Sequence, residues 1–251
     1  MNSIGIYVDG FNLYYGARAR CGRGTAGWRW LDIRRLVRDV IDARAEPGWA
    51  GSTIAKVIYC TATIDSVTNP SGYADQQTYL KAIRASSSVD RIEYGNFVAR
   101  VKVAPLATRH PITKRPVLVK PAWPVMVQDG GNPVPQAVFM VSYAYREEKG
   151  SDVNVASHLL LDVLGGHIDG AVVISNDSDL SLPVREARMR VPVGIVNPSP
   201  NYTAGKLDAS AAVGAGGHWS TQLGAADFTG HQFPDPVTSL KGYVYSKPPG
   251  W

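Results

Sequence analysis

The 251-residue sequence has few cysteines and no long apolar run. Its two cysteines, Cys21 and Cys60, are too few for a disulfide framework or a structural zinc site. No stretch approaches the ~18 consecutive apolar residues that a membrane-spanning helix needs. The amino terminus also lacks the basic and apolar regions of a signal peptide. We therefore expect a globular cytoplasmic protein that does not enter a membrane.

Several common catalytic motifs are missing as well. The sequence has neither a glycine-rich P-loop for nucleotide hydrolysis nor the Gly-x-Ser-x-Gly turn of serine esterases. Its five histidines do not have the spacing of zinc ligands. Phe11 stands two residues after Asp9, where phosphoaspartyl phosphatases carry a second aspartate. These absences argue against four widespread kinds of hydrolytic chemistry.

Acidic residues are absent from one whole segment of this basic chain. The net charge is +5, and no Asp or Glu lies between residues 94 and 128. The basic residues of that segment are Arg100, Lys102, Arg109, Lys114, Arg115 and Lys120. Such a segment suits contacts with the phosphates of RNA. A solvated, proline-rich loop explains the same composition equally well.

Apolar patterns typical of strands and helices alternate along the chain. They predict strands at residues 3–10, 53–65, 89–105, 136–150, 170–175 and 191–198, and helices at residues 30–46, 73–87, 151–166 and 179–189. The residues between the first strand and the first helix are expected to form a loop. Ser151 is predicted to cap its helix, with Asp152 in the first turn and Gly165-Gly166 at the end.

This alternation predicts a three-layer α/β fold around a central parallel sheet. We expect one domain at residues 1–205, interrupted by a basic, proline-rich insert at about 100–135. Residues 206–251 are expected to form a C-terminal extension docked on that domain.

Aspartates stand where predicted strands end and where a predicted helix begins. Asp9 ends the first strand, Asp177 and Asp179 follow the strand at 170–175, and Asp152 opens the helix at 151–166. Ligands bind at the carboxyl ends of parallel strands, so the acids meet there if the two strands are neighbours. Clustered carboxylates repel one another and need a cation or shifted pKa values, and oxygen ligands favour Mg²⁺ or Mn²⁺.

Each aspartate also has a simpler explanation. Asp177 or Asp179 suits the cap of the helix near Leu180, and Asp152 suits the positive end of a helix dipole. Asp9 before a glycine suits a turn. One cap accounts for only one of the two neighbouring acids.

Three ordered motifs carry a resemblance to a known family. They are YVDGFNLYYG at 7–16, EEKGSDVNVASHLLLD at 147–162 and VVISNDSDLSLPVREAR at 172–188. Together they resemble the NYN domain, LabA-like branch, of the PIN-like nucleases. The resemblance implies a PIN-like fold and a ribonuclease in which Asp9, Asp152, Asp177 and Asp179 hold Mg²⁺ or Mn²⁺. It also implies that Asn12 orients substrate or water, and Asn176 stands where many relatives have glycine.

The predicted function is metal-dependent hydrolysis of single-stranded RNA at internal phosphodiester bonds. Asn12, Asn176 and the six basic residues are the expected substrate contacts, and Tyr14 and Tyr15 are candidates for stacking on bases. Trp28 and Trp30 fit core packing better. The alternatives are a non-catalytic RNA-binding or regulatory module, and a metal-dependent phosphatase or DNA nuclease. The sequence leaves open whether the chain forms a homo-oligomer.

Overall fold

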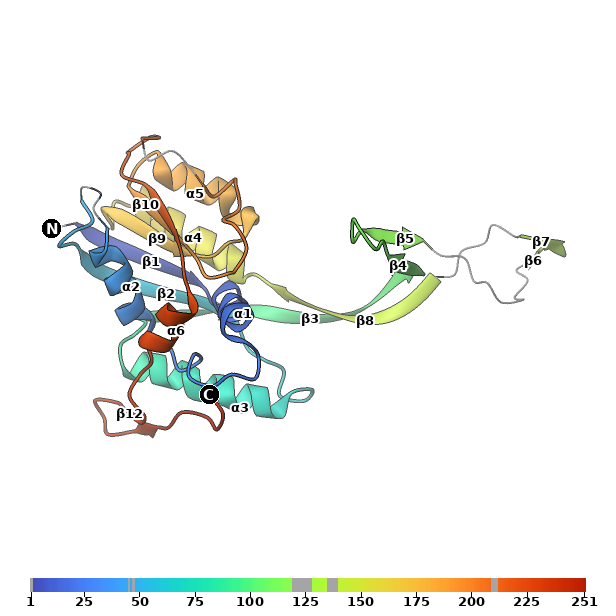
Figure 1. Cartoon of the computed structure of the whole chain (residues 1–251), viewed down its shortest axis with the longest axis horizontal. Coiled ribbons are helices and arrows are strands. Elements are labelled where there is room, and N and C mark those ends of the chain that lie inside the picture. The colour runs from blue at the N-terminus through green and yellow to red at the C-terminus, as the bar shows by residue number, and fades with distance from the viewer. Residues whose placement is uncertain (1, 45, 47, 119–127, 135–139, 209–211) are drawn as a thin grey trace. The chain divides into compact units, whose positions relative to one another are not determined.

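The chain folds into two compact units. The computed structural model describes residues 2–44, 46, 48–118, 128–134, 140–208 and 212–251 (Figure 1). Residues 1–97 and 148–251 form the first unit, and residues 98–147, inserted between them, form the second. Among the described helices, none is both long enough and apolar enough to cross a membrane.

The first unit is organised around a mostly parallel sheet. Its strand order is β11-β10-β9-β1-β2-β3-β8. The strands are β1 (Ser3–Asp9), β2 (Thr53–Ala62), β3 (Arg91–Pro105), β8 (Met140–Lys149), β9 (Gly170–Ile174), β10 (Val193–Asn197) and β11 (Trp219–Gln222). β1 pairs in parallel with both β2 and β9, so the strand order reverses at β1. Such a reversal leaves a crevice at the carboxyl ends of the strands, where ligands usually bind.

Helices cover both faces of the sheet and complete three layers. They are α1 (Gly10–Cys21), α2 (Ile33–Asp42), α3 (Pro70–Ala85), α4 (Ser151–Leu164), α5 (Ser181–Arg188) and α6 (Ala225–Gly230). Ile6 and Val8 share one core with residues of α1, α2, α3 and α6, and Tyr7 shares the other core with residues of α4 and α5 (Figure 1). Successive side chains of a strand point to opposite faces, which gives β1 both cores. The predicted α/β fold is therefore confirmed at the level of layers and sheet.

The expectation of a loop after the first strand is wrong, because α1 begins directly at the end of β1. Asp9 is its N-cap, and its carboxylate accepts a hydrogen bond from the Asn12 backbone N–H. Two glycines conceal the helix in the sequence, since glycine lowers helix propensity. A Cβ at Gly10 would lie 2.6 Å from Tyr59 Cζ, and one at Gly16 would lie 2.7 Å from the Pro198 backbone. These glycines permit close packing against distant segments, which no local pattern reveals.

The start of α4 is displaced by one residue from the expected position. Ser151 is the first helical residue, and the N-cap is Gly150, whose φ of 96° lies in the left-handed region. The Ser151 hydroxyl donates to Glu148 and does not cap the helix. Asp152 lies in the first turn, as predicted.

The residues after 205 contribute to the first unit in several places. β11 is an edge strand of the central sheet, and α6 buries Phe228 in the core. The C-terminal residue Trp251 packs against Trp30 and Tyr79. Trp28 and Trp30 are both buried.

The second unit carries the whole excess of positive charge. It contains the hairpin of β4 (Ala107–Arg109) with β5 (Pro116–Leu118) and the short pair β6 (Gln128–Asp129) with β7 (Asn132–Pro133). Residues 98–147 include seven Lys or Arg and two Asp or Glu, which is net +5. The first unit has 19 residues of each sign and is neutral.

Candidate active site

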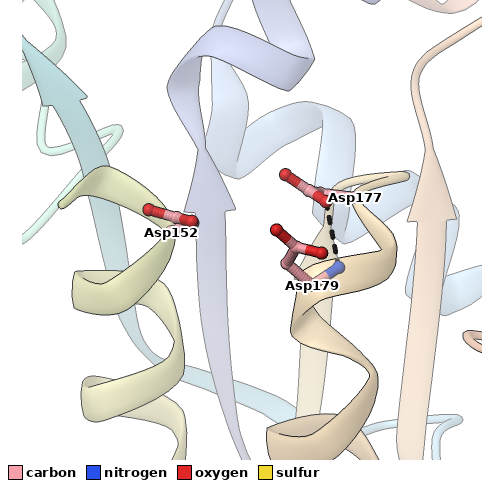
Figure 2. A group of neighbouring side chains, drawn as sticks. All are labelled: Asp152, Asp177 and Asp179. Atoms are coloured by element: carbon pink, nitrogen blue, oxygen red, sulfur yellow. Dashed lines mark hydrogen bonds between the residues drawn. The ribbon is translucent and has the colours of Figure 1, made fainter. Parts of the chain in front are cut away.

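Three aspartates converge at the crevice beside β1. Asp152 stands in the first turn of α4, while Asp177 and Asp179 follow β9 at the short 3-10 helix Ser178–Leu180. One carboxylate oxygen of each lies within 4.8 Å of those of the other two (Figure 2). Of the four acids expected to meet, the structure brings these three together, and Asp9 is not a member of the group. Asp152 and Asp177 are half-buried and Asp179 is exposed, which leaves the group open to solvent.

Asp9 belongs to the same pocket but lies deeper. The pocket has a volume of about 210 Å³ and is lined by Asp9, Phe11, Asn12, Glu148, Ser151, Asp152 and Asp177. Val8 pairs with Ile174 in the sheet, which places Asp9 beside the start of the loop after β9. The described lining contains four acids and no Lys, Arg or His.

Burial raises the pKa of Asp9 to about 6, and the charge of Asp177 adds to the effect. Only 4% of its surface is exposed. Hydrogen bonds from the Asn12 N–H at 2.9 Å and the Ser175 hydroxyl at 3.1 Å act in the opposite direction but do not cancel the burial. A buried carboxylate with a raised pKa is destabilised in its charged form, and a nearby cation would relieve that destabilisation.

Asp177 fulfils the simpler explanation of a cap, while Asp179 does not. The Asp177 carboxylate accepts from the Asp179 N–H at 3.0 Å and caps the 3-10 helix. The Asp177 N–H donates in turn to the Ser175 hydroxyl. Ser175 therefore joins Asp9 to the loop that carries Asp177. Capping leaves the position of the Asp179 carboxylate, beside two others, unexplained.

Asn12 and Asn176 connect loops around the pocket. The side-chain oxygen of Asn12 accepts from the Asn176 backbone N–H at 3.0 Å. The side chain of Asn176 bonds to Ser199, to the Tyr202 carbonyl and to the Ala204 N–H. Both amides thus hold the β9 loop in place, with Asn176 directed at residues 199–204. Of the two, only Asn12 lines the pocket.

Sequence reasoning missed Glu148 and Ser175. The two carboxylate oxygens of Glu148 accept from the N–H and the hydroxyl of Ser151, at 3.1 and 2.8 Å. The sequence offered one signal for Glu148: it is an acid three residues before the first helical residue, within the motif at 147–162. Ser175 is fully buried, and its role depends on the pairing of β1 with β9.

The basic residues expected to contact substrate belong to the second unit. Arg100, Arg109, Lys114 and Arg115 are exposed there. Lys102 lies 3.7 Å from the Glu147 carboxylate and over the ring of Tyr145. Lys120 lies outside the described residues.

The donor set at the crevice fits a hard divalent cation. Mg²⁺ and Mn²⁺ prefer carboxylate oxygens, and Mg²⁺ in particular is held by few protein ligands and keeps part of its water shell. Asp152, Asp177 and Asp179 would hold such an ion at the open side of the pocket. Asp9 adds negative charge from the buried side.

Comparisons with known proteins give two similarities. No family model matches the chain. The chain is 27% identical over 263 residues to the 6-hydroxy-3-succinoylpyridine 3-monooxygenase of Pseudomonas putida, covering 98% of this chain and 74% of that protein. A protein of unknown function from Vibrio parahaemolyticus has a similar structure, with a TM-score of 0.44 and 15% identity. That match covers 88% of this chain and 93% of the other.

Proposed function

We propose that the chain is a PIN-like, metal-dependent ribonuclease of the NYN type that hydrolyses phosphodiester bonds of RNA. The observation that carries the proposal is the convergence of Asp152, Asp177 and Asp179 within 4.8 Å, with Asp9 in the adjoining pocket. Their position at the point of strand reversal supports a ligand site. Mg²⁺ or Mn²⁺, when bound, would supply a water of lowered pKa and offset charge on the phosphate.

Each acid has a distinct task in this proposal. Asp152, on the first turn of α4, and Asp177 and Asp179, at the 3-10 helix after β9, hold the cation between them. Asp9 is fixed by the Asn12 N–H and the Ser175 hydroxyl, and keeps the inner wall of the pocket negative. Glu148 holds the first residue of α4 and so orients the turn that carries Asp152.

The test is cleavage of a labelled single-stranded RNA by the purified protein. We expect cleavage with Mn²⁺ or Mg²⁺, none with EDTA, and a loss of at least a hundredfold in Asp177→Asn. Asp42→Asn is the matched control, because Asp42 is an exposed acid at the end of α2. Cleavage that is insensitive to EDTA, or that persists in Asp177→Asn, would refute the proposal.

The same assay separates the alternatives. RNA binding without turnover at any concentration of either cation would indicate a binding module. Release of phosphate from nucleotide monophosphates, or cleavage of single-stranded DNA alone, would indicate a phosphatase or a DNA nuclease.

The alignment with the pyridine monooxygenase favours a second candidate, oxygenation of a hydroxylated pyridine. The alignment spans nearly the whole chain, at 27% identity. The two-histidine, one-carboxylate set of iron oxygenases is not matched by the aspartate group, to which no described histidine belongs. The test of this candidate is oxygen uptake by the purified protein with 6-hydroxy-3-succinoylpyridine and NADH, measured with added flavin and, separately, with added Fe²⁺. Substrate-dependent uptake would favour it over the nuclease.

A further inference from the structure

A continuous row of aromatic rings begins at the acid pocket and runs along the outside of α1. Phe11 lines the pocket, and its ring contacts that of Phe97 at 5.8 Å and that of Tyr15 at 6.4 Å. Tyr15 contacts Tyr14 at 5.3 Å, and Tyr14 contacts Trp28 at 5.6 Å. The row is therefore Phe97, Phe11, Tyr15, Tyr14 and Trp28, and we refer to it as the aromatic row.

Three rings of the aromatic row are exposed to solvent, whereas Trp28 at its far end is buried. Tyr15 is 55% exposed, and Tyr14 and Phe97 are each 40% exposed. Tyr15 lies one helical turn beyond Phe11, so the two rings share a face of α1. Contiguous exposed rings of this kind on a globular surface mark an interaction site.

Away from the acid pocket, the charge along the aromatic row is positive. Residues 10–31 contain four arginines and no Asp or Glu. Arg18 lies 5.9 Å above the ring of Tyr15, and Arg29 lies 4.4 Å above that of Trp28. None of these four arginines forms an ion pair with a described acid, and Arg20 and Arg29 donate hydrogen bonds to backbone carbonyls. The surface thus offers ring faces and cations together, a combination that suits the bases and phosphates of a nucleic acid strand.

We infer that the aromatic row is a binding site for unpaired nucleotides, which stack on Tyr15 and its neighbours while Arg18 and Arg23 contact the strand's phosphates. This inference rests on the proposed function in that it assigns the substrate as a single strand. Bases paired in a duplex have their faces covered and are unavailable to the rings. Stacking is also tolerant of sequence, because every base has a π-face. The row therefore selects for strandedness and not for a particular base.

The experiment measures binding in EDTA, where no cleavage is expected, to a 12-nucleotide RNA that contains 2-aminopurine. We expect the fluorescence of 2-aminopurine to be quenched on binding to the wild type. Tyr15→Ala should bind about tenfold more weakly or worse and lose the quenching. Tyr15→Trp should restore both, and Arg18→Gln should reduce the slope of log affinity against log salt by about 0.7.

Two controls test whether the effect belongs to this surface. Tyr243→Ala removes a similarly exposed tyrosine from another part of the first unit and should bind as the wild type does. The same RNA annealed to its complement should bind more weakly than the single strand. Single-stranded DNA is tested in the same way. Binding to DNA and not to RNA would identify the ligand as a deoxyribonucleotide strand and would leave the stacking site unchanged.

The outcomes separate this inference from the nuclease proposal. Quenching that depends on Tyr15, without cleavage in Mn²⁺, would support the binding site and refute the nuclease. Equal affinity of wild type and Tyr15→Ala, or duplex binding as tight as single-strand binding, would overturn the inference. If Tyr15→Ala changes the oligomeric state but not the RNA affinity, the aromatic row is a protein interface, and the inference is also overturned.

Discussion

Replacing Asp9 with Asn should make the cation-free protein more stable above pH 6 while it weakens the site. Burial raises the pKa of Asp9 to about 6, from an ordinary value of 3.8. The folded state then binds the proton more tightly than the unfolded state does. The free energy of unfolding therefore falls as pH rises from about 4 through about 6, and above that range the loss is complete.

The magnitude follows from the size of the pKa shift. About two pKa units correspond to about 3 kcal/mol, which is the upper limit of the gain expected for Asp9→Asn at pH 8. The substitution preserves the local structure, because Asn is as good an N-cap as Asp and its side-chain oxygen still accepts from the Asn12 N–H. Its amide would donate to the Ser175 hydroxyl in place of the bond observed.

The assay is urea denaturation in EDTA at pH 4 and at pH 8. Asp9→Asn should match the wild type within about 0.5 kcal/mol at pH 4 and exceed it at pH 8, whereas the surface variant Asp42→Asn should match it at both. Added Mn²⁺ should stabilise the wild type more than Asp9→Asn, because the substitution removes negative charge beside the three ligands. If Asp9→Asn is no more stable than the wild type at pH 8, the carboxylate is not destabilised by burial and the reasoning is refuted.

Three further predictions test the site and the fold. Mn²⁺ at a hundred times its Kd should stabilise the wild type by ~2.7 kcal/mol in a thermal shift assay. Asp179→Asn removes one of the three converging carboxylates and should lose most of that stabilisation at the same Mn²⁺ concentration. An unchanged thermal shift would exclude Asp179 as a ligand. Tyr7→Phe removes the 2.8 Å hydrogen bond to the Asp162 carboxylate and should lower the free energy of unfolding by about 1.5–3 kcal/mol in urea, with cleavage unchanged; a neutral result would show that Lys56 and His167 satisfy Asp162 without Tyr7. Gly10→Ala places a Cβ 2.6 Å from Tyr59 Cζ and should cost about 1–3 kcal/mol by displacing α1, measured in the same way; wild-type stability would mean that the helix yields freely there.

The sequence was sufficient for the layers and for most of the acids, because both follow local rules. β9 is a run of buried apolar residues, and an aspartate at a strand end is visible without any structure. The adjacency of β1 and β9, on which the site depends, is a long-range pairing that local patterns do not contain. From the sequence, this adjacency was therefore only a condition for the acids to meet.

The parts that the sequence did not reveal depend on contacts between distant segments. α1 was hidden because Gly10 and Gly16 serve the packing against Tyr59 and Pro198 and not the helix itself. Asn176 was expected to face substrate, yet its partners lie at residues 199–204, some 25 positions away. Ser175 bridges two acids only because two strands pair in one particular register.

The insertion of the second unit, residues 98–147, into the first has an evolutionary consequence. At its base Gly95 lies so close to Glu148 that a Cβ there would approach the carboxylate within 2.5 Å, so the point of departure is tightly packed within the first unit. The insert takes up the entire net charge and none of the pocket lining. We therefore expect mutation or exchange of the insert to leave the aspartates in place. The sequence of the pocket and the sequence of the charged segment can then change independently of each other during evolution.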